Sequence, residues 1–150
     1  GSRRLGSRGL GSRRLGSRFN GWFCGKQFIV WLFMRNHKKL RAFVLADEVV
    51  VSIYRITSQF PKEELYGLTS QIRKAAVSVP SNIVEGCAPE SKGDYLRFLV
   101  IANGSLRELH YQFSLAVRLG YVKEAPDNFE LLLNETEKVL GALIRSLRKA

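Results

Sequence analysis

The sequence has few of the residues that build metal centres or covalent cross-links. It contains two cysteines and two histidines in 150 residues. Cys24 and Cys87 lie far apart and form no Cys-x-x-Cys pair, which argues against a zinc site, a redox motif and a disulfide framework. A carboxylate-bridged metal site in a helical bundle needs Glu-x-x-His elements, and the spacing of Glu108 and His110 is wrong for one. We therefore expect no metal and no cofactor, and a cytoplasmic protein that keeps both cysteines as thiols.

The motifs of common enzyme families are also missing. The sequence has no phosphate-binding loop, no Gly-x-Ser-x-Gly nucleophile turn and no dinucleotide-binding glycine pattern. Glu85 and Glu108 are candidates for an acid pair across two helices. We interpret both instead as members of ion pairs, with Arg73, Arg97 or Arg107 as partners. The sequence therefore predicts a protein that is not an enzyme and takes no small-molecule substrate.

Acidic residues are absent from the first 41 positions, and this absence locates the charge of the chain. The formal net charge of the whole sequence is +11. Residues 1–41 contain eleven Lys and Arg and no acid, whereas residues 42–150 contain thirteen basic and thirteen acidic residues. The excess positive charge belongs to the N-terminal arm, so an argument from net charge to nucleic-acid binding applies to the arm alone.

The arm begins with an eight-residue unit, GSRRLGSR, that occurs twice within residues 1–18. A stretch of Gly, Ser and Arg with Leu as its only apolar residue is too polar to form a core, so we predict disorder. Three interpretations are open: a nucleic-acid-binding tail, a signal peptide that continues into the apolar run 28–34, or sequence upstream of a start at Met34. Because Met34 is the only methionine, we favour the third, with 1–33 outside the working protein and 34–150 as the folded domain.

The rest of the chain shows the apolar spacing of four amphipathic helices, with apolar residues at steps of three and four. Ser91 and Asp94 have the spacing of a capping box. Pro80 falls inside the second helix and is expected to kink its last turn or split it. The residues expected to mark helix ends are Pro61, Gly86, Gly120 and Pro126. The predicted helices span residues 40–58, 63–85, 92–119 and 126–148.

Short connections between these helices predict an all-α, up-down-up-down four-helix bundle. No segment shows a convincing strand pattern. Several large side chains are assigned to the core-facing stripes, among them Val44, Val51, Tyr54, Leu65 and Val117. The long third helix, at about 1.5 Å per residue, spans roughly 40 Å and forms the central rod of the bundle.

A row of polar residues lies beside the core-facing stripe of the second helix, within an arc of about 80° on a helical wheel. Polar side chains beside a core bond across helices or across subunits more often than they remain idle. We therefore expect hydrogen bonds along a helix seam or at a subunit interface. The residues concerned are Gln71, Ser78, Asn82 and Glu85 on the second helix and Ser105 on the third.

The third helix also has more apolar surface than the interior of one bundle needs. Leu96, Val100, Ile101 and Leu115 lie outside its main stripe, and we expect them at subunit contacts. Gly104 lies inside the same helix, where glycine costs about 1 kcal/mol relative to alanine, and we expect close helix packing to explain it.

Several long segments resemble one family. They are YRITSQFPKEELYG at 54–67, LTSQIRKAAVSVPSNIVEG at 68–86, YLRFLVIANGSLREL at 95–109 and LAVRLGY at 115–121. Over about residues 37–148 the chain is similar to the four-helix-bundle proteins encoded in intervening sequences of bacterial 23S ribosomal RNA genes. Asn103 departs from the family pattern, which affects only local packing.

The resemblance implies a homo-oligomer, in the form of a pentameric ring or barrel. It also implies a distant likeness to the accessory variability determinant of diversity-generating retroelements, which partners a reverse transcriptase and contacts nucleic acid through a basic surface. The family pattern supplies no catalytic residues, so none is assigned.

Five arginines of the body are candidates for nucleic-acid contacts. Arg107 and Arg118 share one face of the third helix, with Arg97 to one side, and Arg55 and Arg73 lie on other helices. In a ring this face repeats and forms a basic band that binds phosphate. No aromatic residues interleave with these arginines as a base-stacking platform would require, so we expect contacts that are indifferent to base sequence.

The sequence thus predicts a homo-oligomeric adaptor that contacts RNA, DNA or a nucleic-acid enzyme. The alternative is a scaffold that presents a groove to a partner protein without touching nucleic acid. Neither function involves a membrane.

Overall fold

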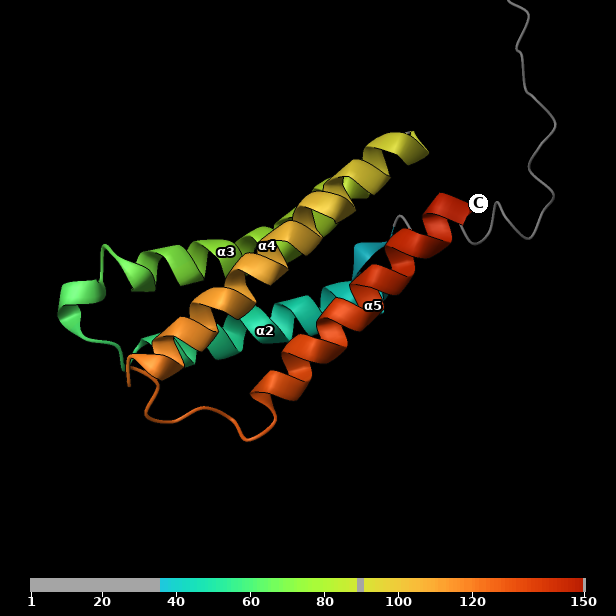
Figure 1. Ribbon diagram of the computed structural model, residues 1–150. Coiled ribbons are helices and arrows are strands. Elements are labelled where there is room, and N and C mark those ends of the chain that lie inside the picture. Colours follow the sequence, from blue (N-terminus) through green and yellow to red (C-terminus); the bar gives the residue numbers. More distant parts are fainter. Residues whose placement is uncertain (1–35, 89–90, 150) are drawn as a thin grey trace, which may run out of the picture.

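The computed structural model describes residues 36–88 and 91–149 (Figure 1). The arm at residues 1–33 and the start predicted at Met34 lie outside the described residues. All regular elements within the described ranges are helical, which confirms the all-α prediction. They are η1 (His37–Lys39), α2 (Arg41–Thr57), η2 (Lys62–Glu64), α3 (Leu68–Gly86), α4 (Lys92–Arg118) and α5 (Phe129–Lys149).

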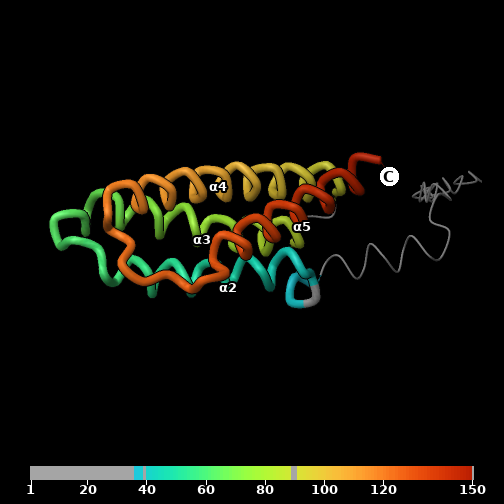
Figure 2. The backbone as a smooth tube through the Cα atoms, turned by 60° about the horizontal axis from the view of Figure 1, so that its bottom comes forward, coloured from blue at the N-terminus to red at the C-terminus, as the bar shows by residue number. Residues whose placement is uncertain are grey.

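The four long helices form an up-down-up-down bundle, as predicted. Each packs against the two helices beside it, α3 against α2 and α4, and α5 against α4 and α2. The α2–α3 and α4–α5 connections lie at the same end of the bundle, and the C-terminal end of α5 lies at the opposite end (Figure 2). We refer to the end with these two connections as the connection end.

The core consists of aliphatic side chains together with one pair of aromatic rings. Burying such a side chain contributes about 1.5–3 kcal/mol to the free energy of unfolding. Phe113 of α4 and Phe129 of α5 meet edge to face, with ring centroids 4.7 Å apart. The fully buried aliphatic residues include Val49, Ile53, Ile72, Val79, Ile83, Leu99, Leu106, Leu109, Leu133 and Leu140.

Helix α3 begins five residues later than predicted. The segment before it forms the short helix η2 and a turn, and the Glu64 carboxylate accepts the backbone N–H of Leu68 at 2.8 Å. This bond caps α3 at Leu68, so Leu65 lies in the turn, half exposed, and its assignment to the core is wrong. The predicted split at Pro80 does not occur, since α3 continues to Gly86.

The ends of α4 agree with the sequence signals. Ser91 Oγ accepts the backbone N–H of Asp94 at 3.1 Å, which confirms the N-terminal cap. Gly120 has a φ of +73° and ends the helix, with its N–H bonded to the Val117 carbonyl and the next N–H bonded to the Ala116 carbonyl. These two bonds form a Schellman motif, in which glycine adopts the left-handed conformation without a Cβ clash.

Two other predicted helix ends are wrong. Pro126 is not the first residue of α5, which begins at Phe129. The Phe129 N–H instead closes a turn on the Pro126 carbonyl, at 2.9 Å. Gly86 does not follow α3 but is its last residue, and a Cβ there would lie 3.0 Å from the side chains of Tyr95 and Phe98. Gly86 therefore allows α3 and α4 to approach closely.

The core-facing side of α2 also differs from the predicted stripe. Val44, Val51 and Tyr54 are each nearly half exposed, whereas Ala42 and Ala46 are buried. Because α2 packs between α3 and α5, its interior side is formed by Ala42, Ala46, Val49, Ile53 and Ile56, and the three half-exposed residues lie on its flank. Val117 of α4 is likewise nearly half exposed, close to the end of its helix.

Candidate nucleic-acid interface

Two of the candidate arginines lie along one edge of α4. Arg107 and Arg118 are exposed and, among the described residues, have no ion-pair partner. His110 of α4 contacts Glu137 of α5, with Nδ1 3.2 Å from Oε1. Because Arg107 lies three positions before His110, it is on the same side of α4, the side that faces α5. Arg118 follows three turns later on that side.

Arg97 lies toward the other end of α4. Its guanidinium is 4.0 Å from the Asp94 carboxylate and lies over the Phe98 ring, 4.9 Å from the ring centroid. Ten residues separate it from Arg107, which places it about 15 Å along the helix and about 80° around the helix axis from that residue, off the face that Arg107 and Arg118 share. The structure therefore does not bring Arg97 together with the α4 pair.

Arg55 and Arg73 lie on a different surface, between α2 and α3. Arg73 Nε donates to Thr57 Oγ1 at 2.8 Å, and the guanidinium carbon lies 4.7 Å from the centroid of the Tyr54 ring. Arg55 is exposed in the last turn of α2. The five candidates thus divide into an α4 edge, an isolated Arg97 and an α2–α3 pair.

A groove runs between α2 and α3 at the connection end, and we call it the α2–α3 groove. It consists of two adjoining open hollows, of about 600 and 790 Å³, that share Tyr54 and Val77. Three cationic side chains line the groove, and the described lining residues include no acid. These side chains are Arg55, Arg73 and Lys74.

The groove also contains two tyrosines that the sequence analysis did not associate with the arginines. Tyr54 was assigned to the core, and Tyr66 fell inside the helix predicted over 63–85. Tyr66 lies instead in the turn before α3 and is 93% exposed. The sequence did contain a signal for this groove, since the aromatic–basic pair Tyr54 and Arg55 lies on the helix before the basic pair Arg73 and Lys74.

The polar row on α3 divides between a helix seam and the surface. Ser78 Oγ lies 2.8 Å from Ser105 Oγ of α4, and Asn82 Nδ2 donates to the Ser78 carbonyl at 2.8 Å and to its hydroxyl at 3.0 Å. The Ser78–Ser105 pair joins α3 to α4 within one chain, and the Asn82 bonds to Ser78 stay within α3. Gln71 and Glu85 are exposed on the outside of this seam, and their role at a subunit interface stays a prediction.

The surface of α4 beside this seam is partly apolar. Val100 and Ile101 are each 43% exposed, and Gly104, about one turn later on α4, is also exposed. We call these three residues the α4 outer face. Leu96 and Leu115, predicted at subunit contacts with them, are only partly exposed. A Cβ added at Gly104 would have no atom within 4 Å, so the expectation that helix packing explains this glycine is wrong within one chain.

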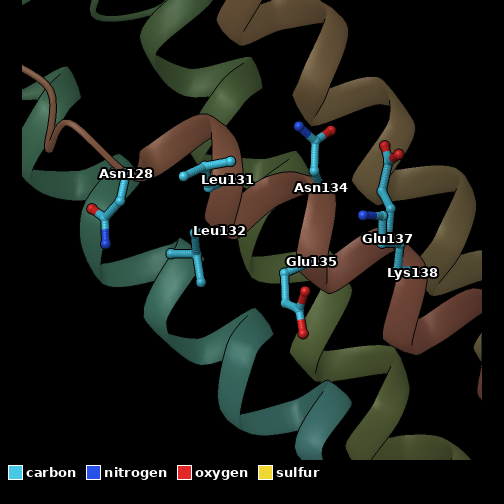
Figure 3. Close-up of a pocket in the computed structure, with 7 residues that line it drawn as sticks. All are labelled: Asn128, Leu131, Leu132, Asn134, Glu135, Glu137 and Lys138. Carbon is cyan, nitrogen blue, oxygen red and sulfur yellow. The ribbon is translucent and has the colours of Figure 1, made fainter.

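A further hollow lies along the first half of α5, where the labelled side chains project in several directions rather than toward a common point (Figure 3). Two of its acids already have partners. Glu135 is paired with Arg41 of α2, and Glu137 with His110 of α4. This hollow therefore offers no convergent polar groups and is not a candidate site.

The described residues contain no group of three or more His, Cys, Asp or Glu that is able to hold a metal ion. The ion pairs expected for Glu85 and Glu108 do not form in this part of the chain, where Glu108 instead accepts a hydrogen bond from Gln112 at 3.0 Å. Within the same ranges no helix has the length and apolar character needed to span a membrane.

Comparison with known proteins agrees with the resemblance seen in the sequence. The family model of the 23S rRNA-intervening sequence protein matches residues 38–145. No match was found among curated proteins. The matched residues include all of α2, α3 and α4 and most of α5, so the match spans the whole bundle. The chain belongs to the 23S rRNA-intervening sequence protein family.

Proposed function

We propose that the protein is a cytoplasmic, non-enzymatic adaptor that binds the phosphate backbone of nucleic acid as a homo-oligomer. The observation that carries the proposal is the α4 edge. Arg107 and Arg118 are exposed there without an ion-pair partner among the described residues, in a body whose residues 42–150 carry no net charge. Exposed arginines that are not neutralised within the protein suit phosphate contacts.

Self-association is supported by the α4 outer face. A glycine inside a helix costs about 1 kcal/mol relative to alanine, and no side chain of the described residues packs on Gly104 to offset that cost. Exposed Val100 and Ile101 lie beside it. A second copy that packs on this face would be able to approach the α4 backbone closely, because Gly104 has no side chain. In a closed ring, which we propose as a pentamer, the α4 edge would recur once per subunit and form a continuous basic band.

The test is a salt series of binding constants for duplex RNA and duplex DNA. Each phosphate contact adds a slope of about −0.9 for B-DNA to the plot of log K against log salt. Replacing both Arg107 and Arg118 by Gln removes two contacts, so the slope for DNA should become shallower by about 1.8. Because the arm is the same in both proteins, its contribution to the slope cancels in the comparison.

The matched control is the double variant Arg145→Gln with Arg148→Gln, which removes the same charge from exposed positions near the end of α5. Its slope should stay close to that of the unmodified protein. Equal slopes for the two double variants would contradict the proposed edge. A protein that binds neither duplex at low salt would favour the alternative, a scaffold that uses the apolar α4 outer face to hold a partner protein.

A further inference from the structure

The α2–α3 groove combines exposed aromatic rings with cations, and the fold alone creates this combination. Tyr54 and Arg55 come from α2, Arg73 and Lys74 from α3, and Tyr66 from the turn between them. Aromatic rings beside a basic groove are the features by which proteins hold single-stranded nucleic acid, with bases stacked on the rings and phosphates on the cations.

The Tyr54 ring is held in place by its neighbours. Arg73 lies over the ring at 4.7 Å and is fixed by its bond to Thr57 Oγ1. The Thr57 hydroxyl is fixed in turn by donating to the Ile53 carbonyl at 2.8 Å. The residue as a whole still keeps 45% of its surface exposed. The Tyr54 ring, with the Arg73 guanidinium over it, therefore lines the groove in a fixed position before any ligand binds.

Tyr66 is displayed from a turn that is held by several hydrogen bonds. Glu64 accepts the Leu68 N–H at 2.8 Å and the Tyr121 hydroxyl at 3.2 Å, and its carbonyl accepts the Gly67 N–H at 3.0 Å. These bonds fix the backbone on both sides of Tyr66, while the side chain itself is almost fully exposed. Nothing within the described chain explains a large aromatic ring in this position.

The charges of the groove favour a polyanion over a partner helix. Arg55 and Lys74 are exposed and have no ion-pair partner among the described residues, and Arg73 is bonded to a neutral hydroxyl. The Glu64 carboxylate accepts the two hydrogen bonds described above and lines neither hollow. Glu63 is the other acid of the turn region, and it does not line either hollow.

We propose that the α2–α3 groove binds a single strand of nucleic acid, with unpaired bases stacked on Tyr66 and Tyr54 and phosphates contacted by Arg55 and Lys74. The occupant is single-stranded because the faces of duplex bases are covered by their neighbours. The proposal rests on the proposed nucleic-acid function but uses a different surface from the α4 edge. It also corrects the expectation from sequence that no aromatic platform accompanies the arginines.

The first experiment is photo-crosslinking of the full chain to an unpaired oligonucleotide that carries thiouridine, followed by mass spectrometry of the crosslinked peptides. RNA and DNA versions of the oligonucleotide are run in parallel, and a crosslink from either supports the groove. We expect crosslinks in the peptides that contain Tyr54 and Tyr66. Because the readout is positional, contacts made by residues 1–35 cannot hide it. Crosslinks confined to that segment or to α4 would overturn the proposal.

The second experiment compares affinities of variants for the same oligonucleotide and for a duplex. Tyr66→Leu should weaken single-strand binding by about 5- to 150-fold, the range expected for one stacked base. It should leave duplex binding unchanged. The control is Tyr111→Leu, since Tyr111 is 61% exposed and lies one turn after Arg107 on α4. A loss of single-strand affinity in Tyr111→Leu rather than Tyr66→Leu would overturn the groove assignment.

The contribution of the cations is measured in a salt series with the single strand. Replacing Arg55 and Lys74 by Gln should make the slope shallower by about 1.4, at about 0.7 for each phosphate of a single strand. Groove variants that behave like the unmodified protein, together with an effect of Arg107→Gln and Arg118→Gln, would reject the groove but retain the proposed function. Binding to neither single strand nor duplex would reject both.

Discussion

Tyr95, in the first turns of α4, is the most strongly perturbed titrating residue among those described. Only 6% of its surface is exposed. Burial raises the pKa of its phenol well above the ordinary value of 10.0, and the neighbouring Cys87 thiol raises it further. The phenol packs where Gly86 lets α3 approach α4. A neutral phenol is therefore part of the folded contact between the two helices.

The raised pKa predicts a loss of stability at alkaline pH. Below pH 10 the phenol is protonated in the folded and the unfolded chain, so its contribution to stability is complete. Above pH 10 the unfolded chain releases the proton while the folded protein retains it, which favours unfolding by about 1.4 kcal/mol for each pH unit up to the folded pKa. Tyr95→Phe should remove this dependence. The check is the free energy of unfolding in denaturant, measured for both proteins between pH 9 and 11.

A constant difference between the two proteins across that range would contradict the assignment. A difference that shifts in favour of Tyr95→Phe as the pH rises would support it. Other groups titrate in the same window, but they are common to both proteins and cancel in the difference.

At the scale of helices, the sequence predicted the elements well and their starts less well. α2 and α4 agree with the predicted ranges to within one residue at each end, because apolar spacing, Ser91 and Gly120 are local signals. The starts of α3 and α5 depend on how the preceding connection folds back on the helix. A carboxylate cap from Glu64 and a turn at Pro126 compete with continued helix, and helical periodicity does not reveal which wins.

Two glycines, one on α3 and one on α4, should respond in opposite ways when each is replaced by alanine. Gly86→Ala forces a Cβ to within 3.0 Å of Tyr95 and Phe98. Overpacking of this kind should lower the free energy of unfolding by about 1–3 kcal/mol. Gly104→Ala meets no neighbour in the described part of the chain and should raise it by up to about 1 kcal/mol. Denaturant unfolding at low protein concentration measures both. Destabilisation of similar size at both positions would show that the contact at Gly86 is not special.

At the scale of the whole molecule, the candidate sites were the part that sequence reasoning predicted least. The five arginines are exposed or partly exposed, but their grouping depends on which helices lie side by side. Tyr54 and Arg73 are far apart in sequence, and only the packing of α3 on α2 brings them together. Helical periodicity describes each helix alone, so it places a flanking tyrosine in the core.

Self-association of the chain is the prediction that concerns the whole molecule. We expect light scattering to give a mass that is a multiple of the chain mass at micromolar concentration. Gly104→Gln places a longer side chain on the α4 outer face and should reduce that mass while the helical content stays the same. Ser114→Gln is the control, because Ser114 is exposed on the same helix toward the α5 side. A monomer in the unmodified protein, or equal effects of the two substitutions, would contradict assembly through this face.

The Ser78–Asn82–Ser105 seam has a consequence for the alignment of α3 along α4. The aliphatic side chains of the core resemble one another from turn to turn, so hydrophobic packing alone discriminates weakly against a slip of one helical turn, about 5.4 Å. Such a slip would move the Ser78 hydroxyl from Ser105 to the neighbourhood of Ile101 or Glu108. The hydroxyl pair at 2.8 Å exists at one register only, while the Asn82 amide, bonded to Ser78 within α3, holds the Ser78 side chain in place. A small polar cluster thus selects one alignment of α3 along α4, where hydrophobic packing alone would allow several alignments of similar stability.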